Sequence, residues 1–220
     1  MNKETKIIYS CVVLSLLLVG AFIFLWTLKI NQMGQIKLRS HDNLERFVTR
    51  DISTTDADGV SRNFFELKGK VWLISHVFTR CPGQCAGVCA VLNELRDEVN
   101  DEGLLHLVSV TLDPSHDEPT HLKAFSEKHG LVSKGWWFLT GDPDQLNNYM
   151  MEVFSLSAQE KNEEQRSGPD DLFAHRPMVA LIDHDLKIRG WYDPFDERSN
   201  KSLRENLSSI INELKSSRGS

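Results

Sequence analysis

The hydrophobic positions of the chain fall into short runs separated by polar segments, and the spacing within each run predicts its structure. Uninterrupted apolar runs are typical of buried strands, whereas apolar residues that recur every three or four positions form one face of a helix. The first pattern predicts strands at residues 71–79, 104–112, 136–139, 178–183 and 187–192. The second predicts helices at residues 117–129, 143–153 and 199–214.

Two further segments complete this prediction. Residues 47–70 contain two short strand-like stretches around the turn sequence DADG, so we expect a β-hairpin before the first long strand. Residues 157–171 are polar and rich in turn-forming residues, and we expect a surface loop there. Strands that alternate with helices and end in a hairpin and a helix predict an α/β sandwich with a mixed central sheet.

An uncharged apolar stretch at residues 7–28 precedes this domain. At about 1.5 Å per residue it is long enough to cross a bilayer core of about 30 Å, and no small-residue cleavage site follows it. We therefore predict a short tail at 1–6, a single transmembrane anchor at 7–28, a linker at 29–44 and a folded domain at 45–216. The net charge of −6, without a basic stripe, argues against a nucleic-acid partner.

The junction between the first long strand and the following helix carries the candidate chemistry. Cys81 and Cys85 lie there, with Pro82 suited to the first helical position and Cys81 to the N-cap. A helix N-terminus favours negative charge, so both thiols should ionise more easily than a free cysteine. Thiols four positions apart suit a soft metal ion or a disulfide, and two buried structural cysteines are the simpler alternative.

A metal site would need a third ligand. Two thiolates and one imidazole favour Cu(I) or Zn over Mg or Ca, and the chain has eight histidines. His175 is the first choice because it follows the polar segment and stands at the entrance of a strand. The other histidines suit a core or solvated position: His41, His76, His106, His116, His121, His129 and His184.

Four motifs in the same order resemble the Sco family of membrane-anchored copper chaperones, also called SenC-like. Residues 77–85 (VFTRCPGQC) resemble its F-T-x-C-P-x-x-C signature, and residues 108–119 (VSVTLDPSHDEP) resemble its S-V-D-P-x-x-D-x-P segment. Residues 138–141 (FLTG) resemble its L-T-G. His175, with the strand after it and residues 188–193 (IRGWYD), resembles the family's metal-binding histidine and its R-G-x-Y-D hairpin.

This resemblance implies a thioredoxin-like fold projecting from a bacterial inner membrane into the periplasmic space. It implies one copper ion bound by Cys81, Cys85 and His175, with Asp113 beside the site. An aspartate that caps the turn before Pro114 is the alternative reading of Asp113. The implied partners are the copper-site subunit of cytochrome c oxidase, or another extracytoplasmic cuproprotein, and a protein that reduces the thiols.

The chain also departs from the family pattern. Arg80 replaces a frequent histidine, Cys89 is an additional thiol, and Pro177 lies close to His175. Because thioredoxin-fold oxidoreductases often place a cis-proline opposite their cysteines, we predict a cis peptide bond before Pro177. We expect Cys89 to be a small helix residue, with a resolving thiol or a fourth ligand as the alternative.

Two functions therefore remain open from the sequence. The first is a copper-binding assembly factor that does not turn over as an enzyme. The second is a thiol–disulfide oxidoreductase in which Cys81 is the nucleophile and Cys85 the resolving thiol, with Arg80 and Pro177 as its support. A redox sensor built on the same pair is a third, weaker reading.

Overall fold

The computed structural model describes residues 19–20, 46–99, 103–132 and 134–218 of the chain. We describe the compact unit Arg46–Ser220. The predicted tail, anchor and linker lie outside the described residues, apart from two positions of the anchor. No helix within the described ranges has both the length and the apolar character needed to cross a membrane.

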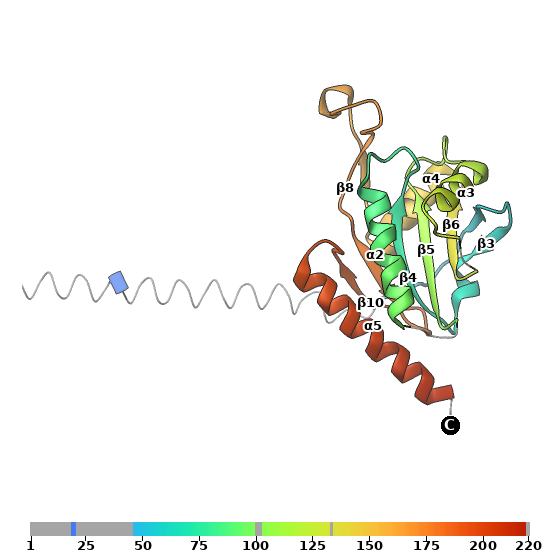
Figure 1. Cartoon of the computed structure of the whole chain (residues 1–220), viewed down its shortest axis with the longest axis vertical. Helices are drawn as coiled ribbons and strands as arrows, with labels where there is room; N and C mark the ends of the chain where they lie inside the picture. Colours follow the sequence, from blue (N-terminus) through green and yellow to red (C-terminus); the bar gives the residue numbers. More distant parts are fainter. Residues whose placement is uncertain (1–18, 21–45, 100–102, 133, 219–220) are drawn as a thin grey trace, which may run out of the picture. The chain divides into compact units, whose positions relative to one another are not determined.

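An eight-stranded mixed sheet forms the centre of this unit, in the order β1-β10-β9-β4-β5-β6-β2-β3 (Figure 1). Strands β4, β5 and β6 pair in parallel, whereas β9 and β10 on one side and β2 and β3 on the other pair antiparallel. The strands are β1 Arg46–Phe47, β2 Ser53–Asp56, β3 Ser61–Asn63, β4 Val71–Val77, β5 Leu105–Thr111, β6 Trp136–Thr140, β9 Val179–Ile182 and β10 Lys187–Tyr192. The mixed sheet and the strand–helix alternation agree with the prediction.

Helices cover both faces of the sheet. Leu73 of β4 packs in an apolar cluster with α2, α3 and α5, whereas Trp72 and Ile74 pack in a second cluster with α4 and η1. Alternate residues of a strand point to opposite faces, so a strand covered on both sides is apolar throughout. The helices are η1 Phe64–Leu67, α2 Gln84–Val99, α3 Pro119–Lys128, α4 Pro143–Phe154 and α5 Glu197–Arg218.

The helix that follows β4 begins later than predicted. It starts at Gln84, so Pro82 is not its first residue and Cys81 is not its N-cap. Gly83 has a φ of +147°, a conformation that favours glycine, and α2 begins at the next residue. Cys85 still lies in the first helical turn.

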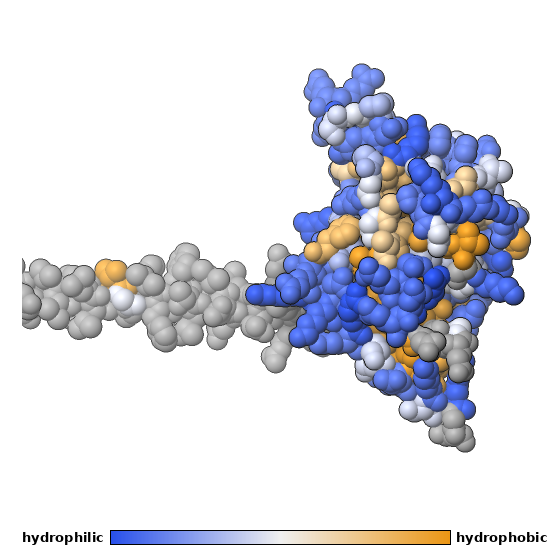
Figure 2. Space-filling view, viewed as in Figure 1, coloured by the Kyte–Doolittle hydropathy of each residue, from blue (hydrophilic) through white to orange (hydrophobic). Residues whose placement is uncertain are grey.

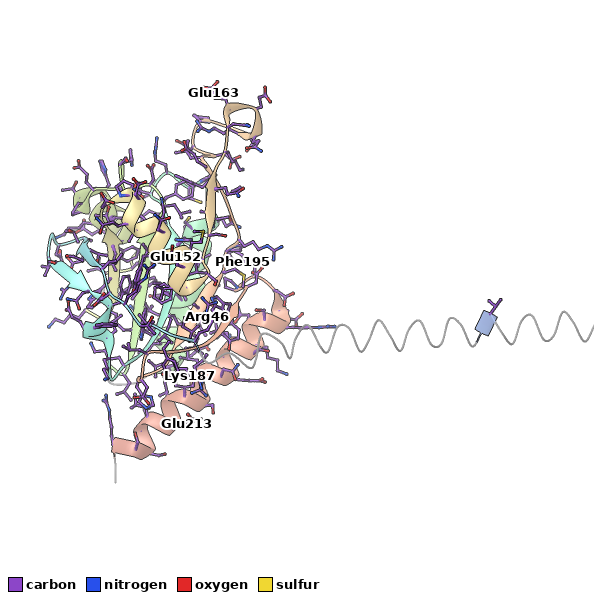
Figure 3. All side chains as sticks on the ribbon, turned by 180° about the vertical axis from the view of Figure 1, so that it is seen from behind. Arg46, Glu152, Glu163, Lys187, Phe195 and Glu213 are labelled. Carbon is purple, nitrogen blue, oxygen red and sulfur yellow. The ribbon has the colours of Figure 1, made fainter. Side chains whose placement is uncertain are left out.

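The segment predicted as a surface loop is instead part of a second, two-stranded sheet. Strand β7 (Ala158–Glu160) pairs antiparallel with β8 (Phe173–His175), and a short helix η2 (Glu163–Gln165) lies between them. This β7–β8 hairpin projects from the body of the unit (Figure 1), and Glu163 marks its far end (Figure 3). An ion pair of 2.6 Å between Lys161 and Asp171 closes it.

Candidate metal centre

The two cysteines of the motif lie together at the end of β4 and the start of α2. Both are free thiols, Cys81 partly exposed and Cys85 fully buried. The backbone amide of Cys85 donates a hydrogen bond of 3.3 Å to the Cys81 sulfur. The thiol of Cys85 also donates a hydrogen bond to that sulfur. The spacing in the sequence therefore predicted their proximity correctly.

The two thiols differ in acidity. The hydrogen bond from the Cys85 thiol is the main cause that lowers the pKa of Cys81 to about 5, with backbone amides and the charge of His175 adding to it. The same hydrogen bond and burial raise the pKa of Cys85 well above its ordinary value. The prediction of easier ionisation is therefore right for Cys81 and wrong for Cys85. At neutral pH the pair holds one thiolate and one thiol.

His175 lies at the end of β8, partly exposed, near the cysteine pair. Its ring packs edge-on against the buried Phe78, with 6.2 Å between the ring centroids. Because Phe78 immediately precedes the cysteine turn, this contact connects the β7–β8 hairpin to the strand that carries the thiols. Phe173 of β8 also packs against Phe78, with 5.3 Å between the ring centroids, so two aromatic contacts join the hairpin to the segment before the cysteines.

The three predicted ligands are not fully assembled in this structure. Within the described ranges, three potential ligand atoms from His, Cys, Asp or Glu come within 4.8 Å of one another only at Asp113, His116 and Asp117. At least one pair of ligand atoms among Cys81, Cys85 and His175 is therefore more than 4.8 Å apart. Metal binding by all three predicted residues would require the β7–β8 hairpin or the imidazole to move closer.

A buried carboxylate fixes the turn that leads to Cys81. Asp117 is completely buried and accepts hydrogen bonds from the amide (3.0 Å) and hydroxyl (2.5 Å) of Thr79. It also accepts one from the Thr111 hydroxyl (2.5 Å) and lies 3.0 Å from Nδ1 of His116. Both carboxylate oxygens therefore already have two partners, which explains the cluster without a metal ion.

The sequence pointed to Asp113 rather than to Asp117. Asp113 lies nearby and forms an ion pair of 2.5 Å with Arg80. Arg80 is thus held by a carboxylate, and it is not among the groups that lower the pKa of Cys81. The role of Asp117 was missed because only its burial distinguishes it from other aspartates in the same polar segment.

The two remaining departures have different outcomes. Cys89 is buried one turn beyond Cys85, where its thiol bonds to Ser109 and burial raises its pKa to about 12. The prediction of a cis bond before Pro177 is wrong, because the described residues contain no cis peptide bond. The amide of Met178 donates to the carbonyl of Arg176 at 2.7 Å, a tight turn that a trans peptide accommodates.

Comparison with known proteins identifies relatives of this chain by sequence and by structure. The SCO1 protein homolog of Bacillus subtilis (strain 168) is 28% identical over 146 residues, which cover 64% of this chain and 73% of that protein. The structure of BsSco, a member of the Sco family of cytochrome c oxidase assembly proteins identified with a disulfide switch, superimposes with a TM-score of 0.63. It is 22% identical and covers 78% of this chain and 95% of its own.

A second solved structure is ScoI of Bradyrhizobium japonicum with copper bound. It has a TM-score of 0.60 and 19% identity, over 75% of this chain and 98% of that chain. These similarities show that the unit has the α/β, thioredoxin-like Sco fold. The SCO1/SenC profile matches residues 42–212, which is most of the 220-residue sequence, and the chain therefore belongs to the SCO1/SenC family.

Proposed function

We propose that this protein is a copper metallochaperone in which Cys81, Cys85 and His175 hold one copper ion as cargo. The observation that supports it most directly is the cysteine pair, in which the Cys85 amide donates to the Cys81 sulfur at 3.3 Å and this contact helps to lower the pKa of Cys81. Membership of the SCO1/SenC family and the copper in ScoI of Bradyrhizobium japonicum support the choice of metal. The recipient is the dinuclear copper site of cytochrome c oxidase or of a related extracytoplasmic cuproprotein, as the assembly role of the Sco family suggests.

The three proposed ligands have different roles in binding copper. Cys81 is partly exposed and already charged, so an incoming ion meets this sulfur first. Cys85 is protonated and must release its proton when it becomes a ligand, which makes binding weaker at low pH. His175 approaches from the β7–β8 hairpin. Two sulfur donors and an imidazole form a set that favours Cu(I) over hard cations.

The remaining parts of the chain suit a membrane-bound chaperone. We propose that residues 7–28 anchor the protein in the bacterial inner membrane and that residues 29–44 connect the anchor to a periplasmic domain at 45–216. The uncharged stretch at 7–28 supports this arrangement. The recipient protein is then a neighbour on the same side of the membrane, and a thiol-reducing protein keeps the cysteine pair reduced.

An anaerobic titration of the full-length protein with Cu(I) against a competing chelator tests the copper site. Wild type should bind with thiolate-dependent absorption, Cys81→Ser and Cys85→Ser should lose this signal, and His175→Ala should bind more weakly. His121→Ala is the matched control, because His121 is exposed on α3. Wild-type affinity in His175→Ala would refute the ligand assignment, and absence of thiolate-bound copper in wild type would refute the function.

The low pKa of Cys81 beside a protonated thiol also favours a thiol–disulfide oxidoreductase. In this reaction the Cys81 thiolate attacks a partner disulfide and one partner sulfur leaves as a thiolate. Cys85, after losing its proton, then attacks Cys81, so that the pair ends oxidised and the partner reduced. A mixed disulfide trapped by Cys85→Ser, together with no copper binding by wild type, would favour this second function.

A further inference from the structure

A cavity of about 440 Å³ lies behind the base of the β7–β8 hairpin. It is bounded by the segment that follows α4, by the end of β8 and by the side chain of His76 from β4. Its polar and soft side chains are His76, Ser155, Ser157, Gln159, His175 and Met178. Among the described residues that line this hairpin cavity none is a carboxylate, and Arg176 is the one charged residue. The end of the hairpin is hydrophilic, whereas apolar residues reach the surface nearer the body (Figure 2).

His76 is an unusual residue for its position. It lies in a central strand that is otherwise almost entirely apolar, and only 7% of it is exposed. Within the described ranges its imidazole forms no hydrogen bond, although it borders the hairpin cavity. Its ring nitrogens are not among the fully enclosed polar atoms that lack a partner, so they reach the open space of the cavity. The imidazole is therefore available to a ligand that enters the cavity.

His175 lines the same cavity. It is close enough to His76 for the charge of one ring to act on the other. Met178, partly buried beside the second apolar cluster, adds a thioether two residues after the turn at Arg176. Two imidazoles and one thioether thus face a single space, and none of the three requires a negative charge to bind a metal.

We propose that the hairpin cavity is a second Cu(I) position, with His76, His175 and Met178 as its ligands. Imidazole and thioether donors without carboxylates favour Cu(I) over Mg²⁺, Ca²⁺ or Mn²⁺. The guanidinium of Arg176 disfavours a divalent cation more than a monovalent one, because the repulsion scales with the charge of the ion. This inference deepens the proposed function and rests on it, because it adds a second position for the same cargo.

The two copper positions share His175, so one imidazole cannot complete both at once. In the described arrangement the imidazole borders the hairpin cavity. Movement of this one side chain toward the sulfur pair would take a ligand from the cavity position and add it to the thiolate position.

The test removes the thiols and keeps the cavity. The full-length Cys81→Ser/Cys85→Ser protein is purified in detergent and titrated anaerobically with Cu(I) against a chelator of moderate affinity. We expect one bound Cu(I) without thiolate absorption, and X-ray absorption spectra with nitrogen and one sulfur scatterer. Cys11→Ser and Cys89→Ser are included in this background, which removes all four cysteines of the chain, so that any sulfur scatterer must be a thioether.

Two further variants locate the ion. His76→Leu in the thiol-free background should weaken binding at least tenfold, and Met178→Leu should remove the sulfur scatterer while leaving the fold intact. His106→Leu is the matched control, because His106 is another buried strand histidine, outside the cavity. Circular dichroism establishes that each variant is folded, and Met178→Leu gives the answer if His76→Leu is not.

The outcomes separate this inference from the proposed function. A thiol-free protein that binds no Cu(I), or that binds it equally well with His76→Leu and Met178→Leu, overturns the cavity position. If wild type still shows thiolate-bound copper in that case, the proposed function stands. If wild type shows no thiolate-bound copper while the thiol-free protein binds Cu(I) through His76, the cavity position stands and the proposed thiolate site fails.

Discussion

Replacing Asp117 should be among the most destabilising changes near the cysteine pair. This carboxylate is completely buried and receives four polar contacts from Thr79, Thr111 and His116. Asp117→Ala removes the acceptor and leaves the donors of the turn and of β5 without a partner. Each buried donor that loses its acceptor costs about 1–3 kcal/mol.

The whole loss can be estimated from these contacts. The two hydroxyl groups can rotate toward other acceptors, but the amide of Thr79 cannot, so the separate costs do not add fully. We expect Asp117→Ala to lower the free energy of unfolding by about 3–5 kcal/mol, the range seen when one partner of a buried charged network is removed. Thr111→Val removes a hydroxyl that donates to Asp117 and accepts from the Asp113 amide, and it should cost about 1–3 kcal/mol.

Equilibrium urea unfolding, followed by the fluorescence of the buried tryptophans, measures this loss. Asp113→Ala is the matched control, because it removes a neighbouring carboxylate whose partner Arg80 is about one-third exposed. That ion pair should contribute less than about 1 kcal/mol. A loss for Asp117→Ala no larger than that for Asp113→Ala would refute the assignment of Asp117 as the residue that holds the cysteine turn.

Three other predictions use the same assays. Cys89→Ser should retain the copper stoichiometry of wild type because its thiol is buried against Ser109; loss of bound copper in the chelator titration would contradict this. Gly190→Ala should destabilise the fold by about 1–3 kcal/mol, since a Cβ there would lie 2.6 Å from the Tyr192 hydroxyl, and an unchanged thermal midpoint would refute it. Stability should decrease as the pH falls from 6.5 toward 3, because burial lowers the pKa of His106 to about 3 and the unfolded chain takes up the proton first. His106→Leu should make this decrease shallower in urea unfolding at several pH values, and an identical slope would argue against it.

The strands of the central sheet were predictable because their burial is visible in local composition. Strand β4 is buried along its whole length, and the apolar run at 71–79 predicted it with an error of two residues at its end. The β7–β8 hairpin was not predictable in the same way. Its strands have three residues each, one of them mostly polar, and they pair across a segment that has the composition of a loop.

The candidate site shows the same contrast between residues that local pattern predicts and residues that only the folded structure brings out. The spacing of Cys81 and Cys85 predicted two neighbouring residues, and the structure brings them together although Cys81 lies in the turn before α2 rather than in the helix. The choice of His175 among eight histidines depended on resemblance to a family, since local pattern favoured it only slightly. Asp117 was missed because what distinguishes it, burial of a polar group, arises only when distant segments pack, whereas His76 was expected in the core and lies there.

The two halves of the site differ in how firmly the fold holds them. The cysteine turn continues a central strand and is tied to β5 and to the start of α3 through Asp117. His175 belongs to a separate two-stranded sheet, which meets the segment before the turn through contacts of Phe173 and His175 with Phe78. In a copper complex of all three ligands, the imidazole would therefore be the easier bond to break. Losing it first would leave the ion on two sulfurs, open to a ligand from the recipient protein, which is the order that transfer of cargo requires.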